Sequence, residues 1–458
     1  MAVSVTGRRT LVLPSIALAA ILNTLNNDWI YSSLFYYTHP AWQVAATLLI
    51  PAIVVLAVAA ALTVLLRAEW VVELLDILTL VIVAFFLYTI GRRNGHLEGD
   101  VPLLAKAALA LAVTGLAYAA SHYLSREAMS RLRIAVVVGC VLFLLAPEVL
   151  FPIEHTHELP LVSFFHEHDA AKRRPNTLIL VLDELSDLKS SPVEAALRDG
   201  RRTVFARAVV SSGSDTVSAI PALLSGVELE DDRPCTPTAL CDDVGLFDFA
   251  RQTVERPRVN LVGFFHPYCE MRGLTYCRQI PVFGSDSIIY GYGCNLLQRL
   301  AVAGIKHKPV GCERQWLNAG RAQAARASIA AAVAAAPFWR DGGVLYVHIL
   351  LPHPPGNRDG GTLEEDYAAN LKLAGAFASE LAGRLERSFG DDFLMVVTAD
   401  HPLRLPVWCG MHRYARPGCA EHSTFASTHV PLITIGRGAE KLMSVEGNLK
   451  LFDALDAL

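Results

Sequence analysis

Charged side chains are scarce in this chain of 458 residues. They make up 18% of it, while hydrophobic residues reach 53% and the mean hydropathy is +0.36. The scarcity is uneven, because residues 1–152 hold 17 Asp, Glu, Lys and Arg residues and residues 153–458 hold 67. This split excludes both a uniform soluble globule and a protein embedded in a membrane throughout. A net charge of −4 and the lack of a basic block predict no nucleic-acid partner.

The N-terminal part also lacks a signal-peptide cleavage site before its second apolar stretch, which favours retained membrane helices. Five apolar stretches each reach the length that spans a bilayer core, about 20 residues. They are Leu11–Tyr31, Trp42–Leu66, Trp70–Ile90, Leu103–Leu124 and Ile134–Phe151. We therefore expect a transmembrane domain of five helices over residues 1–152.

Basic residues in the short loops predict the orientation. Six arginines fall on one side of the expected helices, against Arg92 and Arg93, or three residues with Lys106, on the other. The excess of positive charge marks the cytoplasmic side, so the N-terminus is expected in the cytoplasm and everything after Pro152 outside it. The six are Arg8, Arg9, Arg67, Arg126, Arg131 and Arg133.

No CxxC pair occurs, which disfavours a zinc knuckle for the cysteines. Cys140 lies in the fifth apolar stretch, and the other eight cysteines fall in the exported part. Disulfides in an oxidising compartment are the favoured interpretation, although spacing alone leaves their connectivity open. Pairing in sequence order would join Cys235 to Cys241, Cys269 to Cys277, Cys294 to Cys312 and Cys409 to Cys419.

Polar residues inside the apolar stretches have two readings. They either mark a functional surface or form interhelical hydrogen bonds and interface contacts, and the second reading is favoured. The residues are Asn23, Asn26, Asn27 and Asp28 in the first stretch and Glu73 and Asp76 in the third.

From about residue 175, short apolar runs alternate with helical stretches, which predicts a mostly parallel sheet sandwiched by helices. The expected strands are Thr177–Leu182, Val204–Val210, Val259–Phe265, Val344–Leu350, Phe393–Thr398 and Leu432–Ile435. The expected helices are Pro192–Arg198, Gly245–Arg256, Ala319–Ala336 and Leu363–Ser388. Residues 175–458 are thus expected to form an exported α/β domain after a linker at 153–174. Within that linker, Glu154–Asp169 predicts a helix on the membrane surface rather than a metal-binding tract.

Residues able to bind a metal or act as a nucleophile follow several expected strands. Parallel sheets place such residues together at the carboxyl ends of their strands. Each residue alone has a common structural role, such as a helix cap for the threonine. Together the carboxylates, imidazoles and hydroxyl form a plausible tetrahedral metal set. They are Asp183 and Glu184, Thr216 at a helix start, His348 and His353, Asp400 and His401, and His429.

These segments resemble the alkaline phosphatase/sulfatase superfamily over roughly residues 174–437. Within it, the chain looks most like membrane-anchored phosphoethanolamine and phosphoglycerol transferases, including lipoteichoic acid synthases. TVSAIPALLSG matches the stretch in which sulfatases carry a Cys or Ser that becomes formylglycine. Thr216 stands at that position, and a threonine points to the transferases. Two departures are DE at Asp183–Glu184, where the transferases have a single Glu, and DHPLR, beginning at Asp400, in place of the common DHG. A third is LPHPP in place of an HGP-type segment.

The resemblance implies roles for the matched residues. Asp183, Thr216, Asp400 and His401 would bind a divalent metal, zinc by first choice and manganese as the alternative. Thr216 would be the nucleophile, His353 the acid or a phosphate ligand, and His429 the base. Glu184 and His348 would serve a second metal or the substrate, with capping of the following turn the alternative for Glu184.

The implied activity is transfer of a phospholipid head-group phosphate, phosphoethanolamine or phosphoglycerol, to an envelope glycan or lipid hydroxyl through a phosphothreonine. The alternative is a sulfatase-like hydrolase or phosphodiesterase, and a non-catalytic binding protein is a third class. The implied location is the bacterial inner membrane, as a multi-pass protein with its catalytic domain in the periplasm. The oligomeric state stays open.

Overall fold

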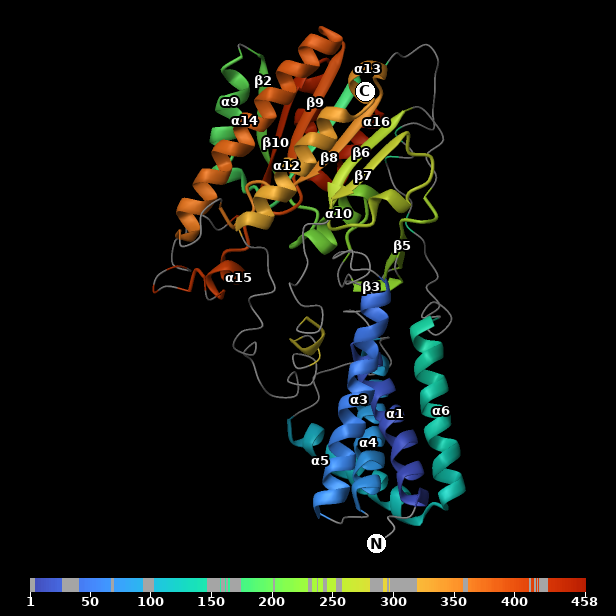
Figure 1. The fold of residues 1–458 in the computed structure, drawn as a ribbon. Helices are drawn as coiled ribbons and strands as arrows, with labels where there is room; N and C mark the ends of the chain where they lie inside the picture. Colours follow the sequence, from blue (N-terminus) through green and yellow to red (C-terminus); the bar gives the residue numbers. More distant parts are fainter. Residues whose placement is uncertain are drawn as a thin grey trace. The chain divides into compact units, whose positions relative to one another are not determined.

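The chain divides into two compact units (Figure 1). The helical unit contains the described residues of 5–145 and 291–296, and the sheet unit contains those of 157–280 and 319–458. The predicted domain boundaries stay a prediction. The computed structural model describes residues 5–26, 41–66, 70–93, 103–145, 157, 161, 164, 174–200, 202–229, 233–236, 238–241, 245–252, 258–280, 291–294, 296, 319–356, 361–411, 413–415, 417, 419 and 427–458.

The helical unit has a helix at each of the five predicted stretches. Helix α1 packs against three others, α3, α4 and α6, and α4 also packs against α5. The helices are α1 (Val5–Leu25), α3 (Ala41–Leu66), α4 (Trp70–Arg93), α5 (Leu103–Tyr123) and α6 (Arg126–Leu145).

Among the described residues, one helical segment is long and apolar enough to cross a membrane. It is Trp42–Val64 in α3, with 23 residues and a mean hydropathy of 2.6. The five predicted spans therefore exceed what the described helices support. In α6, for example, the apolar part begins at Ile134 and the helix ends at Leu145, which is shorter than the roughly 20 residues of a span. Several apolar side chains of α3 are nonetheless exposed, including Ile53 at 64%.

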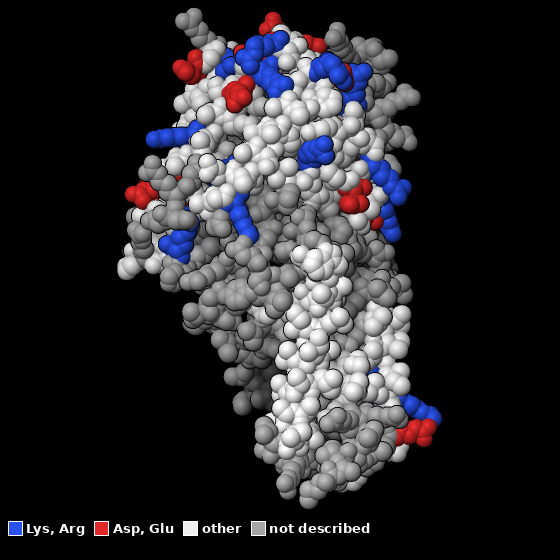
Figure 2. All heavy atoms as spheres, viewed as in Figure 1, with Lys and Arg blue, Asp and Glu red and all other residues white. Residues whose placement is uncertain are grey.

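Charged residues are few on the described surface of the helical unit in Figure 2. Within the unit, Arg133 of α6 binds both carboxylate oxygens of Asp76 in α4, at 2.8 and 2.6 Å. Because Asp76 is 4% exposed, this ion pair is interhelical and buried, which confirms the structural reading of that residue. Glu73 lies in the first turn of α4.

Asn23 near the end of α1 and Asn26 just after it form a second polar contact inside the helical unit. Asn23 donates to the Leu48 carbonyl of α3 at 2.9 Å and accepts a hydrogen bond from the Tyr292 hydroxyl at 2.5 Å. Asn26 donates to the Tyr292 carbonyl at 3.3 Å. A segment far along the chain thus packs on the end of α1. Asn27 and Asp28 lie outside the described residues.

The sheet unit is built on seven strands in the order β2-β10-β9-β1-β8-β6-β7. Strand β10 runs antiparallel to both neighbours, β2 and β9, and the other neighbouring strands are parallel. The strands are β1 (Asn176–Leu182), β2 (Val204–Val210), β6 (Val259–Phe264), β7 (Tyr276–Ile280), β8 (Val344–Ile349), β9 (Phe393–Ala399) and β10 (His429–Gly436). The predicted mostly parallel sheet is confirmed.

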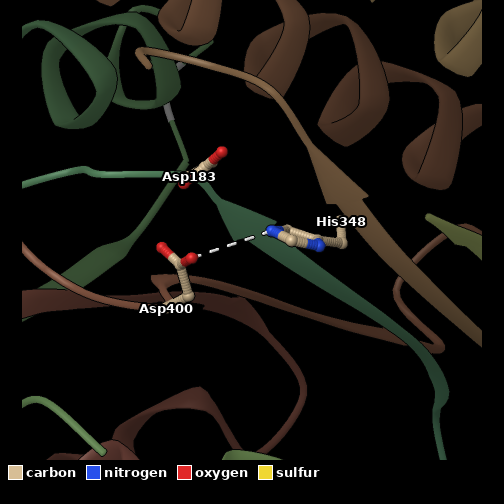
Figure 3. A group of neighbouring side chains, drawn as sticks. All are labelled: Asp183, His348 and Asp400. Atoms are coloured by element: carbon tan, nitrogen blue, oxygen red, sulfur yellow. Dashed lines mark ion pairs between the residues drawn. The ribbon is translucent and has the colours of Figure 1, made fainter. Parts of the chain in front are cut away.

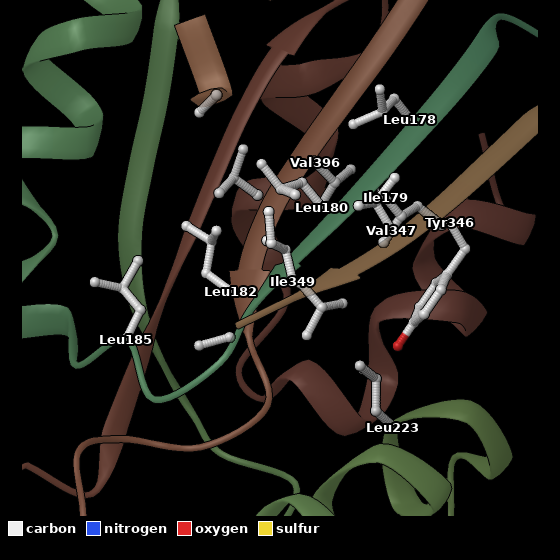
Figure 4. Packing of buried hydrophobic residues seen from close by; sticks show 14 of the residues in the cluster. Leu178, Ile179, Leu180, Leu182, Leu185, Leu223, Tyr346, Val347, Ile349 and Val396 are labelled. Carbon is white, nitrogen blue, oxygen red and sulfur yellow. The ribbon is translucent and has the colours of Figure 1, made fainter. Parts of the chain in front are cut away.

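Helices cover this sheet. Helix α14 contacts β9 and β1, and α12 contacts β6 and β8, as the view in Figure 1 shows. Every residue of β6, β8 and β9 is buried, which explains their continuous apolar sequences. Figure 4 shows side chains of β1, β8 and β9 in this core. The helices are α9 (Ser191–Arg198), α10 (Thr216–Ser225), α12 (Ala319–Ala335), α13 (Phe338–Asp341), α14 (Leu363–Phe389), α15 (Leu405–Cys409) and α16 (Leu451–Asp456).

The predicted helix over Gly245–Arg256 is wrong. Leu246–Asp248 is instead strand β5 of a small antiparallel sheet with β3 (Arg233–Thr236) and β4 (Ala239–Cys241). Phe247 is buried in the core, and the Asp248 carboxylate accepts the backbone N–H groups of residues 250 and 251. An Asx-type turn therefore follows β5 directly.

The linker prediction also needs correction. Leu161 and Phe164 are buried in the main hydrophobic core of the sheet unit, and Arg174 lies over the Phe164 ring at 4.6 Å. Two apolar residues of the expected membrane-surface helix therefore face the protein. The remaining residues between 158 and 173 lie outside the described part.

The structure confirms two of the predicted disulfides, Cys269–Cys277 and Cys409–Cys419. Cys294 is disulfide-bonded, and Cys140 is a free, buried thiol. The side chains of Cys235, Cys241 and Cys312 lie outside the described part of the structure.

Candidate active site

The ends of two adjacent parallel strands bring the predicted acids together. Asp183 follows β1, and Asp400 and His401 follow β9. The register pairs Leu182 with Ala399, so Asp183 and Asp400 leave the sheet at the same level. Both carboxylates are buried, at 1% and 0% exposure, and both lie in the group drawn in Figure 3.

Thr216 is the first residue of α10 and faces this pair. Its Oγ1 lies 3.1 Å from His401 Nε2 and 3.4 Å from Asp183 Oδ1. Asp215 caps the helix by accepting the Ser218 N–H at 3.0 Å. His266 donates from Nε2 to the Thr216 carbonyl at 2.8 Å, which fixes the backbone from the other side. The hydroxyl is thus held at a helix N-terminus, where negative charge is stabilised.

Two histidines turn an imidazole lone pair toward Asp183. His401 Nδ1 lies 2.9 Å from the Pro402 carbonyl and His353 Nδ1 contacts the Pro354 carbonyl, so each Nδ1 donates a proton. Each Nε2 then carries the lone pair, and each lies 3.9 Å from an Asp183 oxygen. His401 Nε2 is also 3.3 Å from Asp400 Oδ2. Neighbouring carbonyls that fix an imidazole in this way are typical of metal-binding histidines.

His348 lies on β8 beside the same acids (Figure 3). Its Nδ1 is 3.0 Å from the Tyr268 hydroxyl, and its Nε2 is 3.9 Å from Asp400 Oδ2. Among the described residues, neither Asp400 Oδ2 nor His348 Nε2 has a hydrogen-bond partner. Donor atoms of Asp183, His348 and Asp400 all lie within 4.8 Å of one another. Buried ligand atoms without a hydrogen-bond partner, such as these two, fit a site for a cation.

Burial sets the protonation of the site. It raises the pKa of Asp183 well above its usual value, and the charges of Asp400 and Glu184 add to the effect. Burial alone would also raise the pKa of Asp400, but His401 and His348 lower it. Burial lowers the pKa of His353 to about 4 and that of His348 to about 3, so both rings are neutral at neutral pH. Neither His348 nor His353 therefore supplies a positive charge beside the carboxylates.

Glu184 is engaged differently from what the sequence predicts. Arg404 donates from Nε to Oε1 at 2.7 Å, and Trp408 donates from Nε1 to Oε2 at 2.5 Å. Although burial would raise the pKa of this carboxyl group, the Arg404 charge lowers it. Both oxygens are bound by the chain itself, which disfavours the predicted role as a second metal ligand. None of the side-chain hydrogen bonds described for Glu184 goes to the following turn, so capping of that turn stays a prediction. Its backbone N–H donates to Asp400 Oδ1 at 3.1 Å.

His429 begins β10, opposite Val210 of β2, at the sheet edge where β9 ends. Its side chain is exposed and its Nδ1 lies 3.1 Å from the Thr428 hydroxyl. No contact among the described residues joins it to Thr216. Its role as a base stays a prediction.

Sequence reasoning missed the residues that support the His353 loop. Arg326 of α12 donates to the carbonyls of Leu350, His353 and Pro355 at 2.8 to 2.9 Å. Asn370 of α14 donates to the carbonyls of His353 at 2.9 Å and Pro355 at 3.1 Å. Three prolines in LPHPP remove N–H donors from this buried loop, so its carbonyls depend on other elements. The sequence signal that could have identified Arg326 is its position as a single arginine on the buried face of an alanine-rich helix.

The donor set fits a divalent metal. Asp183, Asp400, His401 and the Thr216 hydroxyl offer the nitrogen and oxygen atoms that zinc accepts, and manganese accepts the same types.

Comparison with known proteins gives likenesses of fold only. No family model matches the chain, and no curated protein sequence matches it. The fold is similar to the lipooligosaccharide phosphoethanolamine transferase A of Neisseria meningitidis, at 12% identity and a TM-score of 0.37, over 96% of this chain and 92% of that one. It is also similar to the periplasmic domain of a Campylobacter jejuni phosphoethanolamine transferase, at 14% identity and a TM-score of 0.35, over 63% and 90%.

An alkaline phosphatase from the Antarctic bacterium TAB5 matches at 12% identity and a TM-score of 0.34, over 62% of this chain and 98% of that one. These are the kinds of protein that the sequence motifs resemble. At such identities and TM-scores they carry no weight about chemistry, which has to come from the side chains of this site.

Proposed function

We propose that this protein transfers a phospholipid head-group phosphate to an envelope hydroxyl in a metal-dependent reaction with Thr216 as the nucleophile. One observation carries the proposal. The Thr216 hydroxyl stands at a helix N-terminus within 3.4 Å of both His401 Nε2 and Asp183 Oδ1, beside the buried acids Asp183 and Asp400.

Asp183, Thr216, Asp400 and His401 would hold the metal, and His348 adjoins them. When bound, a divalent cation supplies a positive charge that acidifies the threonine hydroxyl and polarises a phosphoryl oxygen. The chain contributes the positions of these groups. It also contributes the N-terminus of α10, whose N–H groups favour the negative charge that develops on the phosphoryl oxygens.

In the first half-reaction Thr216 Oγ1 forms a bond to phosphorus and the bond from phosphorus to the diacylglycerol oxygen breaks. The reaction moves one proton in net from the Thr216 hydroxyl to the departing diacylglycerol oxygen, and His353 is the proposed acid that delivers a proton to that oxygen. A phosphothreonine carrying the head group remains.

In the second half-reaction the oxygen of an acceptor hydroxyl forms a bond to phosphorus and the bond from phosphorus to Thr216 Oγ1 breaks. The proton that the acceptor hydroxyl loses restores the Thr216 hydroxyl. His429 is the proposed base for the acceptor, because it lies at the same sheet edge with an exposed ring. Phosphoethanolamine and phosphoglycerol are both candidate head groups, and the acceptor is an envelope glycan or lipid.

The proposal includes the predicted setting. Five membrane helices over residues 1–152 would hold the catalytic domain at the periplasmic face of a bacterial inner membrane, next to its lipid donor. The apolar helix Trp42–Val64 supports a membrane location. The two disulfides of the sheet unit support an oxidising compartment.

The test is an intact-mass and lipid-product assay on the detergent-purified, metal-replete chain. It is offered phosphatidylethanolamine or phosphatidylglycerol, and the controls are Thr216→Ala and Thr216→Ser. We expect diacylglycerol release and a head-group-phosphate adduct on wild type, a weaker adduct on the serine variant and none on the alanine variant.

Absence of both products with both lipids would sink the proposed donor. Lipid turnover without any acceptor would instead favour the hydrolase alternative.

A further inference from the structure

Two departures from the family pattern meet in one ion pair. The sequence has an extra acid in Asp183–Glu184 and an arginine in DHPLR, and these lie 220 positions apart, at Glu184 and Arg404. In the fold, Arg404 Nε binds Glu184 Oε1 at 2.7 Å. The additional glutamate and the additional arginine therefore form one ion pair, which lies immediately beside the proposed metal ligands.

The pair is built rigidly on its acidic side. Glu184 is fully buried, and its second oxygen accepts the indole N–H of Trp408. Trp408 packs edge-on against the His353 ring, with centroids 4.9 Å apart. Arg404 differs, because its side chain is 26% exposed. The described contacts anchor the guanidinium through Nε, which leaves the fork of terminal Nη groups on the more open side.

Because Glu184 follows Asp183 directly in the chain, its ion pair holds this guanidinium beside the proposed metal ligands. Its charge acts on Asp183 and on Asp215, the cap residue that precedes Thr216. It also acts on His353. These residues come from three different loops, and Arg404 is within electrostatic reach of all of them.

We propose that Arg404, oriented by Glu184 and Trp408, binds an oxygen of the tetrahedral phosphate anion on which Thr216 acts. A planar guanidinium whose two terminal Nη groups have no partner in the described part of the chain matches phosphate oxygens closely. Glu184 then serves as a positioning residue, and Arg404 supplies positive charge on the side where a second metal was predicted. This inference rests on the proposed function, because it names the substrate-anion contact of that site.

The test measures anion binding without turnover, with inorganic phosphate as the probe. Titration calorimetry is carried out on the full-length, metal-loaded chain in detergent, with metal content checked for each variant. The variants are Arg404→Ala, Arg404→Lys and the control Arg413→Ala. Arg413 is a matched control, because it is also 26% exposed and forms an ion pair with a buried acid, Asp366 at 2.9 Å.

We expect Arg404→Ala to weaken phosphate binding by about tenfold or more, as for loss of charged hydrogen bonds. Arg404→Lys should recover part of the affinity, since it keeps the charge without the fork. Arg413→Ala should bind phosphate within about twofold of wild type. Phosphate binding by Arg404→Ala at wild-type strength, or no phosphate binding by metal-loaded wild type, would overturn the inference.

Removing Arg404 leaves the buried Glu184 carboxylate unpaired, so folding is protected with a double variant, Glu184→Gln/Arg404→Ala. It should also bind phosphate about tenfold more weakly than wild type, and wild-type affinity in this variant would count against the inference equally. Failure of the proposed function looks different. A chain that binds phosphate through Arg404 but never forms the Thr216 adduct keeps the anion site and loses the transferase.

Discussion

The two units handle buried charge in opposite ways. In the helical unit, Asp76 is matched by Arg133 through two hydrogen bonds, so the buried charge is neutralised within the chain. In the sheet unit, Asp183 and Asp400 lie at the ends of adjacent strands next to the neutral imidazoles of His348 and His353, and Asp400 Oδ2 has no hydrogen-bond partner among the described residues. The neutralised ion pair therefore has a structural role. Buried carboxylates without a matched positive charge favour the binding of a cation instead.

The largest predicted effect breaks the neutral pair. Asp76→Asn leaves Arg133 without a counter-charge and should destabilise the helical unit by about 3 kcal/mol. Denaturant unfolding in detergent, followed by circular dichroism, measures this. The double variant Asp76→Leu/Arg133→Leu removes both charges and should regain most of the loss. An unchanged unfolding midpoint for Asp76→Asn would show that the pair is not structural.

The next effect concerns the buried arginine of the sheet unit. Arg326→Met removes the donors of three loop carbonyls, of which Asn370 still serves two, and should cost about 2 kcal/mol while lowering turnover through misplacement of His353. Thermal unfolding and lipid turnover measure the two consequences. Arg384→Met is the control, because Arg384 donates to the Ala334 carbonyl from an exposed position. Equal effects of the two variants would contradict the assigned role of Arg326.

A smaller effect of opposite sign is expected at Asp183 in the chelator-treated protein. Because burial, and then Asp400 and Glu184, raise the pKa of Asp183, the folded chain binds its proton more tightly than the unfolded chain. The group therefore costs stability at neutral pH, and the cost fades as the pH falls toward 3.8. Asp183→Asn should stabilise the metal-free chain by about 1 kcal/mol or more at pH 7. If Asp183→Asn instead destabilised the metal-free chain at pH 7, the proposed difference between the buried acids of the two units would be wrong.

The smallest predicted effect tests the contact between Tyr292 and α1. Tyr292→Phe removes the hydroxyl that donates a hydrogen bond to Asn23 and should lower the stability of the helical unit by about 1 kcal/mol. Tyr118→Phe, on a tyrosine of α5 that is 54% exposed, is the control and should change stability by less than about 0.5 kcal/mol. The same unfolding assay compares them, and indistinguishable midpoints would remove this contact from the account.

Local pattern was enough to predict most of the sheet unit. Strand β2 matches its predicted bounds, and α12 and α14 differ from theirs by one residue, because a short run rich in Val and Phe and long helical stretches are strong local signals. The helix prediction for residues 245–256 failed because its outcome depends on the burial of Phe247 and on the turn at Asp248. The local sequence pattern shows neither of them.

The candidate site divides along the same line. Asp183, Thr216, Asp400 and His401 were predicted because strand ends and a helix start locate them, and the structure brings them together. The partnership of Glu184 with Arg404, and the support of the His353 loop by Arg326, join positions far apart in the chain. No spacing rule predicts such pairs, since only the folded topology brings them into contact.

The most direct test of the central claim is the metal content of the purified full-length chain, measured by elemental analysis after dialysis against metal-free buffer. The account predicts about one divalent ion per chain in wild type and in Asp76→Asn, and loss of nearly all of it in Asp400→Asn. Wild-type protein that holds no metal after exposure to zinc and manganese, or an Asp400→Asn variant that retains it, would contradict the account.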